Sequence, residues 1–75
     1  MNKDIIQGQW TQLKGKVKEE WGKLTNDDID SINGRSEQLA GRLQERYGIE
    51  QDEAKRQVAA FEKRMEQEYH KKTGA

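Results

Sequence analysis

The sequence contains no cysteine and no proline, and large apolar side chains are scarce among its 75 residues. Without cysteine the chain has no disulfide framework, no thiolate metal site and no thiol nucleophile. No apolar run approaches the roughly 20 residues that cross a bilayer, and no secretory signal is recognisable, so we expect a cytoplasmic protein without a membrane span. Leucine, isoleucine, valine and phenylalanine make up only 12 of the 75 residues, a share typical of disordered chains.

Net charge is also absent, because 14 basic residues cancel 14 acidic ones. Disordered chains usually combine low hydrophobicity with a high net charge, so composition alone leaves folding open. Domains dedicated to nucleic acid are usually strongly basic, which argues against a nucleic-acid partner. The chain is long enough for one domain, and per-residue scaling gives that domain a stability on the order of 4–11 kcal/mol.

Helical periodicity is what the sequence does contain, in a chain rich in glutamate, glutamine, lysine and arginine. From Ile6 to Leu24, apolar residues recur every three or four positions, which places them on one stripe of a helix. Gly22 is expected to end this helix. A strand cannot have this period, so the segment indicates an all-α protein.

Three further helices are predicted. A short one follows a cap at Thr25 or Asn26, and longer ones cover about 36–47 and 51–69. Asn33-Gly34 predicts a break rather than a kink between the second and third helices. We therefore predict a single all-α domain over residues 1–75, with four helices, a core within about 4–70 and a flexible tail over 71–75. The predicted core consists of the apolar residues of the four stripes: Trp10, Leu13, Val17, Trp21, Leu24, Ile29, Ile32, Leu39, Leu43, Tyr47, Val58, Phe61 and Met65.

An internal repeat is visible when the sequence is shifted by 26 positions, which aligns residues 12–22 with residues 38–48. The alignment favours a duplicated helical hairpin, and chance similarity between amphipathic helices is the alternative. Gly15 and Gly41 match each other in the interiors of their helices, where glycine costs about 1 kcal/mol relative to alanine. We expect close approach of two helices to offset that cost, so that a larger side chain would clash. The alternative is a tolerated surface glycine.

A family resemblance rests on residues spread over nearly the whole chain: Met1-Asn2-Lys3-Asp4, Gly8, Trp10, Gly15-Lys16-Val17-Lys18-Glu19, Trp21-Gly22-Lys23-Leu24-Thr25, Gly41 and Gln44-Glu45-Arg46-Tyr47-Gly48. This spacing of tryptophan and glycine resembles the CsbD-like family of small bacterial cytoplasmic proteins, which are linked to the general stress response. The resemblance implies a compact four-helix fold with two helical hairpins packed crosswise. It supplies no catalytic residues.

Basic residues gather in the N-terminal quarter, and two arginines of the third helix can extend that surface. The candidate interaction surface is Lys14, Lys16, Lys18, Lys23, Arg42 and Arg46. Such a patch would bind phosphates without sequence preference and with strong salt dependence. The alternative is an ordinary solvated face of a charged helix.

No residue is assigned a catalytic, cofactor-binding or metal-binding role. Asp27, Asp28 and Asp30 lack the glycine and terminal glutamate of a calcium-binding loop, and helix capping explains them better. His70 is the only histidine, and no constellation of cysteine, serine or carboxylate accompanies it. The serines likewise have no general-base partner in the sequence.

The predicted function is that of a non-enzymatic stress-response protein, acting as a small folded helical module for binding or structure. Its partner is unknown, no small-molecule substrate is evident, and a monomer or weak dimer is expected. A mean hydropathy of −1.30 motivates one alternative, a hydrophilin-like protectant against desiccation or osmotic stress. A further alternative is a weak binder of nucleic acid or anionic surfaces through the lysine-rich first helix.

Overall fold

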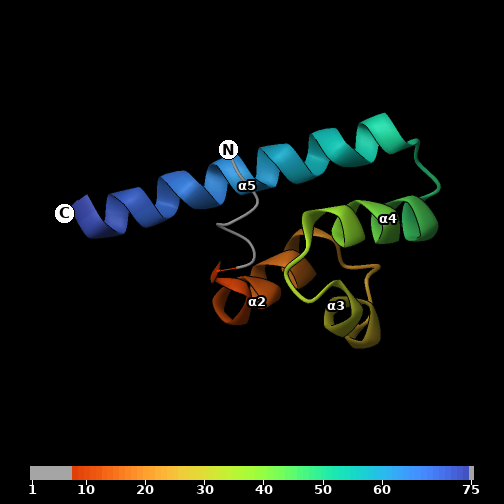
Figure 1. The fold of residues 1–75 in the computed structure, drawn as a ribbon, viewed down its shortest axis with the longest axis horizontal. Helices are drawn as coiled ribbons and strands as arrows, with labels where there is room; N and C mark the ends of the chain where they lie inside the picture. The colour runs from red at the N-terminus through yellow and green to blue at the C-terminus, as the bar shows by residue number, and fades with distance from the viewer. Residues whose placement is uncertain (1–7, 75) are drawn as a thin grey trace.

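The computed structural model describes the backbone of residues 8–74 and the side chains of residues 8–68. This part of the chain forms four helices and no strand, which confirms the predicted all-α fold. The helices are α2 (Trp10–Glu20), α3 (Asn26–Ile32), α4 (Ser36–Tyr47) and α5 (Gln51–Gly74). In Figure 1, α4 and α5 run antiparallel side by side, and α2 and α3 lie together on one side of them. Ile6, predicted to begin the first stripe, lies outside the described residues.

The end of the first helix and the start of the second lie at the predicted signals. Trp21 leaves the helical conformation directly after α2, and Gly22 follows it. The hydroxyl of Thr25 accepts a hydrogen bond of 3.0 Å from the backbone N–H of Asp28. The carboxylate of Asp28 accepts one of 3.0 Å from the backbone N–H of Thr25. This reciprocal capping box satisfies two N–H groups that the helix itself cannot pair.

The predicted break at Asn33-Gly34 is confirmed. Both residues have left-handed backbone conformations, with φ of 49° and 80° respectively, so α3 and α4 are two separate helices. Asparagine and glycine tolerate this region better than other residues do.

The last two helices form an antiparallel hairpin. Gly48, with φ of 65°, ends α4, and α5 begins three residues later. The backbone of α5 continues past Tyr69, its predicted end, to Gly74, because no glycine or proline interrupts the sequence earlier. Its final turns extend beyond the other helices (Figure 1). Within the described residues, no helix has both the length and the apolar character that crossing a membrane requires.

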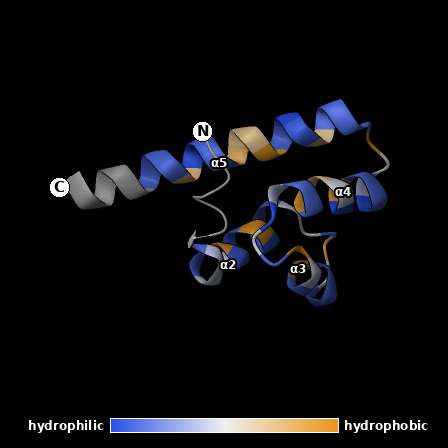
Figure 2. Cartoon of the chain, viewed as in Figure 1, coloured by the Kyte–Doolittle hydropathy of each residue, from blue (hydrophilic) through white to orange (hydrophobic). Residues whose placement is uncertain are grey.

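The core lies where the four helices meet. Every residue of the predicted core is buried except Trp10 and Tyr47, which are partly buried against its edge. Ala40 and Ala54 are buried as well. Figure 2 shows the hydrophobic positions as short patches between longer hydrophilic stretches, as expected when each helix buries one stripe. At the centre, the rings of Trp21 and Phe61 pack with centroids 5.1 Å apart and planes tilted by 55°.

Candidate functional site

The lysines of the predicted interaction surface divide into two groups. The ammonium group of Lys18 donates hydrogen bonds to the carbonyl groups of Gly22, at 3.3 Å, and of Leu24, which satisfies acceptors beyond the end of α2. The ammonium nitrogen of Lys23 lies 5.1 Å from the centroid of the Tyr47 ring, a cation–π distance. Lys14 and Lys16 are exposed on α2.

The two arginines of this predicted surface converge on one carboxylate. Arg46 forms a bidentate ion pair with Asp28, with N–O distances of 2.7 and 2.8 Å. Arg42 lies 3.8 Å from the same carboxylate and 3.0 Å from that of Glu45. Both guanidinium groups therefore have partners within the fold, and they tie α4 to the start of α3.

Asp28 is the anchor of this network and is only 3% exposed. The hydrogen bond from Arg46 is the largest influence on its acidity, followed by the bond from the backbone N–H of Thr25. Both interactions favour the ionised form and hold the pKa of Asp28 well below its ordinary value. Helix capping was predicted for this residue, but the ion pair with an arginine 18 positions away was not.

The tyrosine at the end of α4 also links this helix to the loop after α2. The hydroxyl of Tyr47 accepts a hydrogen bond of 3.2 Å from the backbone N–H of Lys23. Together with the cation–π contact, this bond fixes the loop after α2 against the end of α4. The predicted internal repeat would make Trp21 the counterpart of Tyr47, yet Trp21 is 4% exposed and donates its indole N–H to Gln57 of α5 at 2.9 Å.

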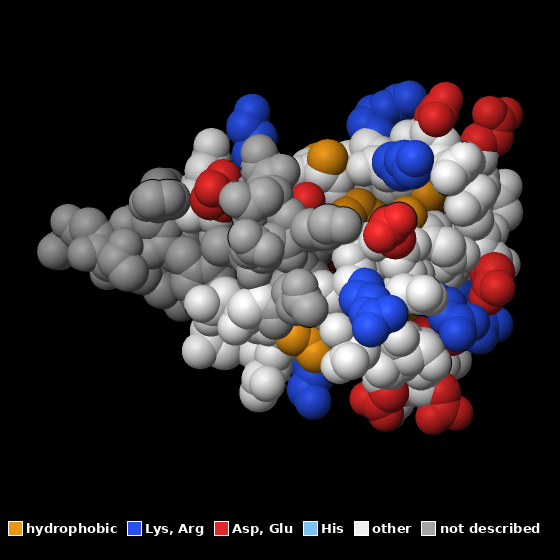
Figure 3. All heavy atoms as spheres, in the orientation of Figure 1, with side chains coloured by type: hydrophobic (Ala, Val, Ile, Leu, Met, Phe, Trp, Pro, Cys, Tyr) orange, Lys and Arg blue, Asp and Glu red, His pale blue; other side chains and the backbone are white. Residues whose placement is uncertain are grey.

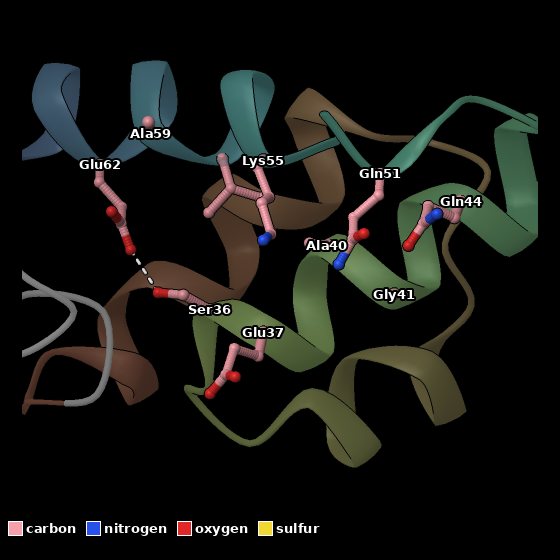
Figure 4. A pocket seen from close by; sticks show the side chains of 10 residues that line it. Ser36, Glu37, Ala40, Gly41, Gln44, Gln51, Lys55, Ala59 and Glu62 are labelled. Atoms are coloured by element: carbon pink, nitrogen blue, oxygen red, sulfur yellow. Dashed lines mark hydrogen bonds between the residues drawn. The ribbon is translucent and has the colours of Figure 1, made fainter. Parts of the chain in front are cut away.

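A groove of about 290 Å³ lies between α4 and α5, and Figure 4 shows its lining side chains. Ser36 and Glu62 meet at one end, joined by a hydrogen bond from the serine hydroxyl to the carboxylate. Gln44 and Gln51 lie at the other end. Its remaining lining residues are Glu37, Ala40, Gly41, Lys55, Val58 and Ala59. This groove is the candidate functional site, because it combines a buried titratable group with an accessible hollow.

Glu62 is only 6% exposed and differs from Asp28 in its surroundings. Burial is the largest influence and raises the pKa of Glu62, while the hydrogen bond from Ser36 acts in the opposite direction. The prediction from sequence missed this residue, although its place four positions after Val58 and three before Met65 puts it on the buried stripe of α5. Among the described side chains, no group of three or more histidine, cysteine or acidic residues has an arrangement that holds a metal ion.

The prediction that Gly15 and Gly41 mark close helix contacts is wrong. A Cβ atom added at either glycine would meet no atom within 4 Å apart from its immediate surroundings in the helix. Gly15 lies on the exposed side of α2, and Gly41 faces the groove rather than a neighbouring helix. The helices approach each other through larger residues such as Leu39 and Leu43, which are fully buried.

Comparison with known proteins gives a consistent result. The sequence model of the CsbD-like family matches residues 4–56. The UPF0337 protein YjbJ of Escherichia coli is 54% identical over 66 residues, which cover 88% of this chain and 96% of that protein. A UPF0337 protein of Xanthomonas axonopodis is 55% identical over 65 residues, or 87% and 94% of the two chains. One from Pectobacterium atrosepticum is 55% identical over 62 residues, or 83% and 90%. No solved structure matches the chain.

Proposed function

Because the chain belongs to the CsbD-like family, we propose that it serves the bacterial stress response as a folded, non-catalytic binding module of the cytoplasm. The observation that carries this proposal is the specificity of its packing. A chain with only 31% hydrophobic residues nevertheless buries a continuous core around Trp21 and Phe61. A polypeptide that acts only by retaining water has no use for such a core.

Buried polar contacts support the same proposal. Asp28 and Arg46 join the consecutive helices α3 and α4, and Trp21 and Gln57 join the end of α2 to α5, 36 positions away. Interactions of this kind favour one arrangement of the helices over others, because a misplaced helix would leave a buried polar group without its partner. A protein that recognises a partner needs such a defined surface, whereas a general protectant does not.

The alternative of a nucleic-acid or anionic-surface binder has less support. Lys18, Lys23, Arg42 and Arg46 all make contacts within the fold. Phosphate binding through them would compete with these contacts, which lowers the gain from each new ion pair.

The proposal is tested by asking whether stress survival requires the folded protein. In a strain that lacks the gene, the wild-type protein should restore survival of the inducing stress. Leu39→Asp places a carboxylate at a fully buried position of α4 and should unfold the domain. We expect this variant not to restore survival when it is expressed at the same level.

Gln38→Asp is the matched control, because it introduces the same residue at the exposed neighbouring position. It should fold and restore survival. Rescue by both variants would overturn the proposal in favour of the protectant, for which composition rather than fold decides. Purified proteins can then be compared in the protection of an unrelated enzyme through drying, where the protectant alternative predicts equal activity of the folded and unfolded chains.

A further inference from the structure

The two buried acids of the described residues are compensated in different ways. Asp28 faces two arginines, whereas Glu62 takes part in none of the ion pairs among residues 8–68 and accepts a hydrogen bond from the neutral hydroxyl of Ser36. A buried carboxylate is costly unless a cation or several hydrogen bonds compensate it.

The groove beside Glu62 has room for a cation on an alkyl chain. Its floor is made by short or apolar residues, Ala40 and Val58 with Ala59 at the edge, and Gly41 contributes no side chain. Figure 3 shows hydrophobic side chains at the bottom of the hollow between α5 and α4, with basic and acidic side chains around them. An alkyl stem would therefore lie on apolar surface while its charged end reaches the carboxylate.

We propose that this groove binds a lysine side chain of a partner polypeptide, with the ammonium group on the carboxylate of Glu62 and the stem along Ala40 and Val58. This inference rests on the proposed function of the protein as a binding module. The amides of Gln44 and Gln51, at the other end of the groove (Figure 4), are placed to pair with the main chain of an extended segment.

Two features of the groove favour this ligand over related cations. One carboxylate oxygen of Glu62 already accepts the bond from Ser36, so a compact ammonium group fits better than the two-pronged guanidinium group of arginine. Lys55 lines the same groove and repels a free polyamine, which carries several positive charges. A polypeptide can instead place an acidic residue opposite Lys55 and satisfy both charges at once.

The test uses an N-acetylated, C-amidated hexapeptide with one lysine and one glutamate, titrated into the labelled full-length protein and followed by NMR. We expect shifts of the amides of Ser36, Gly41 and Lys55, together with a fall in the pKa of the Glu62 carboxyl group, followed through the chemical shift of its carboxyl carbon. A peptide with norleucine in place of lysine should bind at least tenfold more weakly. No shift at these residues up to about 10 mM peptide, a concentration that would reveal a dissociation constant of about 1 mM, would overturn the proposal.

Substitutions locate the site. Glu62→Gln keeps the shape and an acceptor for Ser36, so it should fold normally and lose at least tenfold in affinity. Glu68→Gln removes the same charge from an exposed position of α5 and should bind as the wild type. Gly41→Leu adds a side chain on the groove, where a Cβ atom meets no atom within 4 Å, and should also block the peptide. Unchanged affinity in Glu62→Gln and Gly41→Leu would show that the peptide binds elsewhere.

Two other occupants have distinct signatures. If the chain's own N-terminus fills the groove, removal of residues 1–7 would raise the pKa of Glu62, and the peptide would bind only to the shortened protein. Equal affinity for spermidine and for the peptide would point to a free amine. Either result overturns the proposal.

The survival assay separates this proposal from the proposed function. Full rescue by Glu62→Gln with no rescue by Leu39→Asp would reject the groove as a binding site and keep the binding module. Rescue by Leu39→Asp would reject the binding module itself.

Discussion

Alanine should change the stability of this protein in opposite directions at different glycines. Gly15 and Gly41 lie inside α2 and α4, and Gly48 ends α4 in the left-handed conformation, with φ of 65°. All three have open space where a Cβ atom would be added. Clashes with an added Cβ atom therefore do not distinguish the three sites, and only the backbone conformation does.

The magnitudes follow from this difference. In a helix interior alanine is favoured over glycine by about 1 kcal/mol, so Gly15→Ala and Gly41→Ala should each stabilise the fold by that amount. A left-handed conformation costs an ordinary residue roughly 1–2 kcal/mol, so Gly48→Ala should destabilise it. For a domain of this size each kcal/mol corresponds to a change of roughly 4–8 °C in melting temperature.

Thermal and urea unfolding followed by circular dichroism at 222 nm would measure these differences. The double variant Gly15→Ala/Gly41→Ala should be additive to within a few tenths of a kcal/mol, because the two sites share no contact. Destabilisation by alanine at Gly15 or Gly41 would refute the reasoning and restore a close helix contact there. An unchanged melting temperature in Gly48→Ala would contradict the left-handed end of α4.

The remaining predictions concern the core and the two buried acids. Trp21→Ala should cost roughly 3–5 kcal/mol in urea unfolding, whereas Trp10→Ala, at the edge of the core, should cost about 1–2 kcal/mol; equal costs would contradict the different burial of the two indoles. Ionised Asp28 stabilises the fold above its unfolded pKa of 3.8, so the wild type should lose stability as acid protonates this carboxylate. Asp28→Asn should melt at a lower temperature than the wild type at pH 7, and its stability should lack this part of the dependence on acid. Burial raises the pKa of Glu62 above 4.5, so the stability that its protonated carboxyl group contributes is lost as pH rises. Glu62→Gln should therefore melt at a higher temperature than the wild type at pH 7, and this difference in melting temperature should shrink toward pH 4.

Local structure was accessible to sequence analysis because short-range interactions decide it. The cap at Thr25, the stop at Asn33-Gly34 and the end of α4 at Gly48 each depend on residues within one helical turn. The apolar stripes were equally readable, since a helix that must bury one face repeats its apolar residues with the helical period. α5 is longer than predicted and continues to Gly74. Its apolar stripe ends earlier, but no residue there breaks the helix.

The long-range contacts could not be read in the same way. Arg46 was assigned to a surface patch because its own helix offers no reason to turn toward Asp28. Gly41 was predicted to lie at a helix contact because glycine inside a helix lowers stability, and the sequence does not show what offsets that loss. The unforeseen pairing of Arg46 and the wrong prediction for Gly41 both concern the direction in which a side chain or a helix face points relative to another helix, a relation that spacing along one chain does not contain.

The sequence by itself determined the number and type of the helices among the described residues, most of their ends, and most of the apolar side chains that leave water. Their mutual arrangement was decided by tertiary structure, which pairs Asp28 with Arg46 and Trp21 with Gln57, and which leaves Glu62 at the end of a groove between α4 and α5. The reason is one of range. Caps and turns gain their free energy from neighbours within a few residues, whereas a buried charge gains or loses its free energy according to what another helix brings beside it.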